Sequence, residues 1–122
     1  MTLRNKVLGN KGEDAAADHL SRLGYKITAR NVRTPYGELD LIASLEESTI
    51  FVEVKTRRSR THGLPEEAIT TRKKNHLLAS AQHYLQEKGL SEVPWRIDVV
   101  AVEYGGAGTM ERIEVFENAV CT

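Results

Sequence analysis

The sequence predicts a single α/β domain in which a mixed five-stranded sheet is flanked by helices, with the elements in the order αβββαββ. Stretches with helical spacing of apolar residues alternate with short β-rich runs, and glycine or proline marks most of the boundaries between them. The length of 122 residues adds a third observation, because it suits one hydrophobic core and is too short for two. We therefore treat residues 1–122 as one domain.

Composition narrows the class of protein further. Apolar residues make up 40% of the chain and charged residues 28%, which is typical of a soluble globular protein rather than a disordered or membrane protein. No apolar run approaches the ~20 residues of a membrane span, and the N-terminus lacks the apolar stretch of a secretory signal. We expect a cytoplasmic protein. Its only cysteine, Cys121, excludes an internal disulfide and a thiolate metal site.

The first three elements are a helix, a short strand and a loop. The helix is expected to begin at Gly12-Glu13 and to end at Gly24, a residue type that favours helix C-caps. A strand over residues 25–30 follows, and residues 31–37 have the composition of a loop. The stripe of the helix that we expect to face the core consists of Glu13, Ala16, Ala17, Leu20 and Leu23.

The centre of the chain reads as a hairpin. Two β-rich runs, residues 39–43 and 50–55, are separated by the polar segment 46–49. Residues 57–63 have no apolar periodicity and are expected to form an exposed loop.

A long helical pattern comes next, opened by Pro65 and ended by Gly89. A second helix start at Thr70-Thr71 stays open, because threonine caps helices well. Its stripe contains Ile69, Lys73, Leu77, Ala81 and Tyr84. Strands over residues 95–102 and 113–116, separated by a glycine-rich turn, complete the chain.

The hairpin predicts a pair of opposed acids. A turn centred between Glu46 and Glu47 places Asp40 opposite Glu53, and directly opposed side chains have Cβ atoms about 4.5–5.5 Å apart. Strand alternation puts Lys55 on the same face as Glu53, while the two valines beside Glu53 point the other way into the core. Two carboxylates and one ammonium group are therefore expected to converge.

Opposed like charges destabilise a sheet, so a bound cation would explain them. Mg²⁺ prefers carboxylate oxygens and needs only one or two of them beside water and a substrate phosphate. A neighbouring lysine can orient the attacking water or neutralise charge on the phosphate. The pattern indicates a site for phosphodiester hydrolysis. The alternative is a solvated acid near a turn for Asp40, and an exposed strand face with an ordinary salt bridge for Glu53 and Lys55.

The sequence leaves the roles of two further acids, Glu13 and Glu38, undecided. Glu13 suits the dipole at the start of a helix, but its place on the core-facing stripe makes a third metal-site carboxylate about equally compatible. Glu38 is interpreted as a loop acid that could reach the site.

Several motifs along the chain carry a family resemblance. They are Gly9-x-x-Gly12-Glu13, Asn31-x-Arg33, residues 37–43 (GELDLIA), residues 51–57 (FVEVKTR), Lys73 and residues 96–100 (RIDVV). With these motifs the chain resembles, along nearly its whole length, the small bacterial YraN-like proteins that are assigned as endonucleases. Those proteins belong with Holliday-junction resolvases and restriction enzymes in the PD-(D/E)xK superfamily, whose core has the order αβββαβ.

The resemblance implies roles for individual residues. Asp40, Glu53 and Lys55 take the D, E and K positions of the motif, and Glu13 matches the acid in the first helix of the resolvases. The residue before Asp40 is Leu39, where the motif has its proline. The expected activity is a restriction-endonuclease-like hydrolysis of DNA by metal-activated water.

In that reaction Asp40 and Glu53 are expected to bind Mg²⁺ or Mn²⁺, with the Val54 carbonyl and Glu13 as further ligands, and Lys55 to serve the water and the transition state. Duplex or branched DNA is the favoured substrate class, and a symmetric homodimer is plausible because a branched duplex offers two strands to cut.

Basic residues near this centre are expected to contact phosphates. For Lys73, simple packing of a long side chain along the helix is an equal alternative. The rival to the enzyme as a whole is a module of the same fold that binds nucleic acid or a protein partner without cleavage. The expected nucleic-acid contacts are Arg33, Arg57, Arg58, Arg60 and Lys73.

Overall fold

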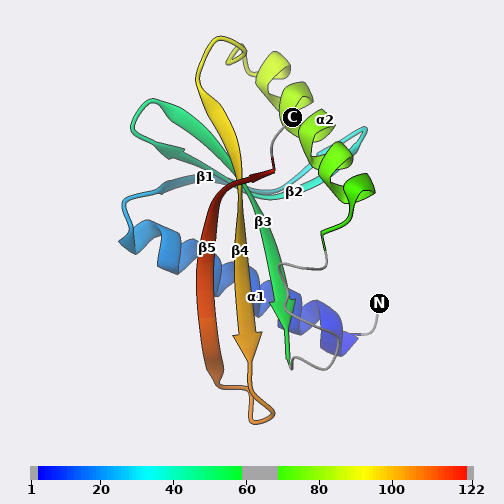
Figure 1. Cartoon of the computed structure of the whole chain (residues 1–122), viewed down its shortest axis with the longest axis vertical. Coiled ribbons are helices and arrows are strands. Elements are labelled where there is room, and N and C mark those ends of the chain that lie inside the picture. Colours follow the sequence, from blue (N-terminus) through cyan, green and yellow to red (C-terminus); the bar gives the residue numbers. More distant parts are fainter. Residues whose placement is uncertain (1–2, 59–68, 121–122) are drawn as a thin grey trace.

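The computed structural model describes residues 3–58 and 69–120, which form one sheet with a helix on each face (Figure 1). The elements follow the predicted order: α1 (Leu3–Arg22), β1 (Lys26–Thr34), β2 (Gly37–Leu45), β3 (Ser48–Arg57), α2 (Thr71–Glu87), β4 (Trp95–Tyr104) and β5 (Met110–Val120). The strands lie in the order β1-β2-β3-β4-β5. Neighbouring strands pair antiparallel except β3 and β4, which pair parallel, so the sheet is mixed as expected.

Helix α1 begins at Leu3, so the predicted start at Gly12-Glu13 is wrong. A glycine inside a helix costs about 1 kcal/mol relative to alanine, which weakens a helix without ending it. The predicted end is correct, because Gly24 has a φ of +97° just after the helix. Leu23 was expected on the core-facing stripe, but it lies beyond the last helical turn and is exposed.

The predicted loop over residues 31–37 is also wrong. Strand β1 continues to Thr34, only Pro35 and Tyr36 form the turn, and β2 starts at Gly37. The pairing with β2 supplies the hydrogen-bond ladder, and that contact is not visible in local composition. Asn31 has a φ of +52°, which explains why this part of the strand looks loop-like in sequence.

The β2–β3 hairpin has the predicted register. Its turn consists of Glu46 and Glu47, and the paired residues run from Leu45↔Ser48 to Leu41↔Val52. Asp40 and Glu53 follow directly beyond the last pair. The predicted register is therefore confirmed, although the paired ladder ends one residue before Asp40 and Glu53.

Each face of the sheet has its own apolar cluster. On the α1 side, Ala16 and Leu20 pack against Leu41, Val52 and other strand residues. On the α2 side the cluster is formed by Leu39, Ile42, Phe51, Leu77, Ala81, Leu85, Ile97 and Val120. Consecutive residues of β2 and β3, such as Leu41 and Ile42, thus face opposite helices.

Helix α2 starts at Thr71, with Thr70 as its N-cap accepting a hydrogen bond from the Lys73 amide at 3.1 Å. The second helix start is confirmed, while Pro65 lies outside the described residues. Strand β5 is longer than the predicted 113–116 because it pairs with β4 along most of its length. Within the part of the chain that the structure describes, neither helix has an apolar stretch that could cross a membrane.

Candidate active site

The candidate site lies where β2 and β3 stop pairing, one residue beyond the Leu41↔Val52 pair. There the Asp40 carboxylate replaces a backbone carbonyl as the acceptor: its Oδ2 receives a hydrogen bond from the Val54 amide at 2.9 Å. The backbone of β3 therefore holds Asp40 at the point where β2 and β3 separate, which we call the fork of the hairpin.

Glu53 is buried on the α2 side of the sheet, with only 4% of its side chain exposed. Its Oε1 lies 3.6 Å from the Lys55 Nζ and 3.5 Å from the Lys73 Nζ. Its Oε2 is buried and has no hydrogen-bond partner among the described residues. The alternative of an exposed strand face is wrong for Glu53, because its side chain is buried. The unsatisfied buried carboxylate oxygen costs free energy.

The two acids of the hairpin interact strongly. Burial and, after it, the negative charge of Glu53 raise the pKa of Asp40 from its ordinary value of 3.8 to about 7. The Val54 amide and the charge of Lys73 act in the opposite direction but are weaker. Asp40 and Glu53 are thus near neighbours, and the lysine contacts of Glu53 do not cancel the unfavourable burial of a charge on Asp40.

Glu13 approaches the same centre from α1. Its Oε1 lies 3.7 Å from an Arg30 guanidinium nitrogen, and the Asn31 amide, oriented to satisfy its neighbours, donates to Glu13 at 3.1 Å and to Glu38 at 3.2 Å. Burial and then the charge of Asp40 raise the pKa of Glu13. The acid of the first helix is therefore within electrostatic reach of the hairpin.

A glycine allows α1 to come this close. A side chain at Gly12 would collide with the Thr56 side chain of β3. The absence of a Cβ at Gly12 lets the helix lie directly on the strand and brings Glu13, the next residue, to the fork.

Asn31 is the site residue that sequence reasoning missed. Asn31 belongs to the Asn31-x-Arg33 motif, but the motif by itself predicted no role for this residue. Its left-handed backbone and its two acidic neighbours, Glu13 and Glu38, become visible only when α1, β1 and β2 are assembled. Asparagine tolerates positive φ better than most residues, which is the one signal that the sequence contains.

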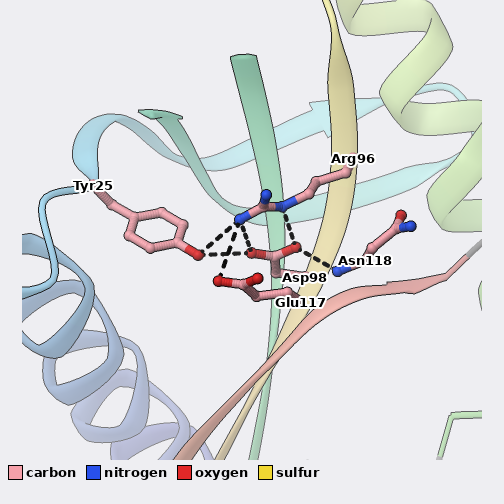
Figure 2. Close-up of polar contacts among 5 residues, drawn as sticks. All are labelled: Tyr25, Arg96, Asp98, Glu117 and Asn118. Atoms are coloured by element: carbon pink, nitrogen blue, oxygen red, sulfur yellow. Dashed lines mark hydrogen bonds and ion pairs between the residues drawn. The ribbon is translucent and has the colours of Figure 1, made fainter. Parts of the chain in front are cut away.

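A second buried acid, Asp98, differs from Glu53 in being fully satisfied (Figure 2). Its Oδ1 accepts from the Arg96 Nε at 2.9 Å and the Asn118 amide at 2.8 Å, and its Oδ2 from the Tyr25 hydroxyl at 3.0 Å and an Arg96 Nη at 3.2 Å. Arg96, two positions before Asp98 on β4, thus pairs with it through two nitrogens. With four donors on two oxygens, Asp98 has no capacity left for a cation.

The donor set at the fork fits a magnesium-like ion. Within residues 3–58 and 69–120, no three His, Cys, Asp or Glu side chains stand close enough to form a metal site by themselves. Mg²⁺ does not need such a cage, since one or two carboxylates suffice when water and phosphate complete the shell. The unpartnered Glu53 Oε2 and the neighbouring Asp40 supply that minimum.

Of the expected phosphate contacts, the structure brings Lys73 to the acids of the site. The Lys73 amine reaches Glu53, so its stem is not merely packed along the helix. Arg33 is 90% exposed on β1 and lies 3.8 Å from Glu38. Arg57 ends β3, Arg58 follows it and is exposed, and Arg60 lies outside the described residues.

Residues 12–102 match the model of "Uncharacterised protein family UPF0102". The chain is 49% identical over 106 residues to a UPF0102 protein of Syntrophotalea carbinolica, covering 87% of this chain and 86% of the relative. It is 41% identical over 120 residues to one from Dehalococcoides mccartyi, covering 98% of each chain. A third, from Symbiobacterium thermophilum, is 47% identical over 115 residues, covering 94% of this chain and 97% of the relative.

Proposed function

The chain belongs to the UPF0102 family, and on that premise we propose that it is a metal-dependent endonuclease that hydrolyses phosphodiester bonds of DNA, with branched or otherwise structured DNA as its favoured substrate. The observation that carries the proposal is the buried pair of neighbouring acids, Asp40 and Glu53, in which two lysine amines approach one Glu53 oxygen and the other oxygen has no partner. Stability alone does not favour two neighbouring buried acids with one carboxylate oxygen left unsatisfied.

Asp40 and Glu53 would hold Mg²⁺ or Mn²⁺, with Glu13 and the Val54 carbonyl as further ligands. When bound, the ion supplies Lewis-acid polarisation of the scissile phosphate and lowers the pKa of an attacking water. The protein's own contribution is to keep both acids in place: the Val54 amide fixes Asp40, and burial under α2 fixes Glu53.

Lys55 acts on the reacting groups. Its ammonium is directed to the same carboxylate as that of Lys73, so the two cations border the acids from β3 and from α2. In this position Lys55 orients the attacking water and stabilises charge that develops on the phosphate in the transition state. Before substrate binds, the Lys73 ammonium group pairs with the Glu53 carboxylate. When substrate binds, the same ammonium group pairs with a phosphate.

The remaining basic side chains position the substrate without reading its sequence. Arg33, Arg57, Arg58, Arg60 and Lys73 contact backbone phosphates, which makes binding strongly dependent on salt. A symmetric homodimer would supply a second centre for the second strand.

The test compares wild type, Asp40→Asn and Glu117→Gln on labelled linear, flapped and four-way DNA with Mg²⁺ or Mn²⁺. Asp40→Asn removes one carboxylate of the pair and is expected to lower the cleavage rate by at least about 10²–10³-fold. Glu117 is an exposed acid of the Asp98 cluster whose ion-pair partner is Arg96 rather than a residue of the candidate site, so Glu117→Gln should cleave like wild type.

Cleavage that survives in Asp40→Asn would remove this carboxylate from the mechanism. If the wild type bound every substrate and cut none, the non-cleaving module would be the better description.

A further inference from the structure

The turn between β1 and β2 presents an exposed aromatic ring that the proposed chemistry does not use. Tyr36 is 52% exposed, and among the described residues only Leu23 and Met110 are comparably exposed large apolar side chains. Figure 1 shows the β1–β2 turn reaching past α2, on the opposite side of the molecule from the C-terminal end of α1.

The turn is held rigidly against α2. The Thr34 hydroxyl accepts a hydrogen bond from the Tyr36 amide at 3.1 Å and is hydrogen-bonded to the Gly37 carbonyl at 2.9 Å. The same hydroxyl is hydrogen-bonded at 2.9 Å to the hydroxyl of Ser80, a buried residue of α2. The His83 ring meets the Tyr36 ring nearly edge-on at 6.1 Å. A ring that is ordered in advance loses little conformational entropy when it binds a ligand.

The turn and the candidate site are parts of one hairpin. Tyr36 precedes Asp40 by four positions, which corresponds to about 13 Å along an extended strand. A bound DNA substrate is longer than this distance, so one substrate can reach both the turn and the acids of the hairpin. Arg33, 90% exposed and only loosely paired with Glu38, stands beside the turn to take a phosphate.

We propose that Tyr36 stacks on an exposed DNA base at a branch or flap and so gives this protein its preference for structured over continuous duplex DNA. The inference rests on the proposed nuclease function and adds the residue that selects the substrate. In a continuous duplex, both faces of each base are covered by its neighbours, whereas unpaired bases and helix ends offer a free face. Stacking tolerates any base, which suits a protein whose other contacts are to phosphates.

Binding is measured in the Asp40→Asn background, so that no substrate is consumed, on flapped DNA with 2-aminopurine at the branch and on a linear duplex of the same sequence. With Tyr36 present, binding should quench the 2-aminopurine fluorescence. Tyr36→Ala should abolish the quench and raise the Kd for flapped DNA about tenfold more than the Kd for linear DNA. Tyr36→Trp should restore both signals, because it restores a stacking surface.

Leu23→Ala is the matched control, since it truncates an equally exposed apolar side chain far from the turn. It should leave the quench and both Kd values unchanged. No quench with Tyr36 present would overturn the proposal, and so would an equal loss of affinity for the two DNAs in Tyr36→Ala, which would describe a general contact or a folding defect.

The two proposals fail in different ways. Wild-type protein that quenches the branch base but cleaves nothing would overturn the nuclease and leave the stacking role. A Tyr36→Ala enzyme that cleaves flapped and linear DNA in the wild-type ratio of kcat/KM would overturn the stacking role and leave the nuclease.

Discussion

Asp98 and Glu53 are both buried acids of the sheet, but they affect stability in opposite ways because their hydrogen-bond partners differ. Asp98 receives four hydrogen bonds and joins β4, β5 and the segment after α1 into one network. Glu53 has two lysine amines at 3.5–3.6 Å on one oxygen and no partner on the other. A satisfied buried carboxylate stabilises a fold when its partners are in place, whereas an unsatisfied one costs free energy that only a ligand can offset.

Asp98→Ala should therefore lower the free energy of unfolding by about 3–5 kcal/mol, because Arg96 and the Tyr25 hydroxyl lose their buried acceptor. Glu117→Gln, in the same cluster (Figure 2), should change it by less than about 0.5 kcal/mol, since Glu117 is 65% exposed and lies 3.7 Å from Arg96. Urea denaturation measures both. Similar losses in the two variants would mean that the exposed acid, not the buried one, stabilises the cluster.

Asp40 predicts a dependence of stability on pH. Its pKa of about 7 lies above the ordinary 3.8, so the folded state favours the protonated form. The stability that this preference contributes is present below about pH 4 and is lost as the pH rises towards 7. In metal-free buffer, Asp40→Asn should thus match wild type near pH 4 and exceed it at pH 8, by at most about 4 kcal/mol.

Urea denaturation of both proteins in chelator at the two pH values measures this difference. Added Mg²⁺ or Mn²⁺ should reduce the gap at pH 8 by stabilising only the wild type. An Asp40→Asn protein that is less stable than wild type at pH 8 without metal would contradict the repulsion between the two acids.

At the scale of elements, the site depends on two departures from regular packing. Strands β2 and β3 separate at Asp40, so the Asp40 side chain, rather than a backbone carbonyl, accepts the hydrogen bond from the Val54 amide. Helix α1 lies against β3 at Gly12, where Thr56 occupies the space that a Cβ would need. The first departure positions the hairpin acid, and the second brings the helix acid, Glu13, towards it.

Two glycines of α1 offer a matched comparison. Alanine is favoured over glycine in a helix by about 0.5–1 kcal/mol, so Gly9→Ala, with nothing within 4 Å of its new Cβ, should stabilise the protein by about that amount. Gly12→Ala should instead destabilise it by about 1–3 kcal/mol, because the new methyl group meets Thr56. Thermal unfolding reports both signs. Stabilisation by both substitutions would show that α1 does not need the close approach.

At the scale of the whole molecule, the site is assembled from both faces of the sheet. Glu13 comes from α1 on one face and Lys73 from α2 on the other, and they meet the hairpin acids where the sheet forks. The chain carries 17 basic and 17 acidic residues, so attraction to DNA does not come from net charge. It depends on where the basic side chains lie, which the fold controls.

Much of this arrangement was accessible from local patterns. The order of elements, the hairpin register and the proximity of Asp40 to Glu53 all follow from short-range rules, namely turn position and the alternation of side chains along strands. The same rules failed for the first helix and for β1, because a helix tolerates glycine and a strand can draw its stability from a partner strand.

Three other features of the site have a different origin. Glu53 is buried, Lys73 of α2 contacts it, and Asn31 links Glu13 to Glu38. Each joins residues from separate elements, so it exists only once the helices are packed on the sheet. Propensity and periodicity describe a residue's neighbours along the chain, whereas these electrostatic contacts depend on neighbours in space.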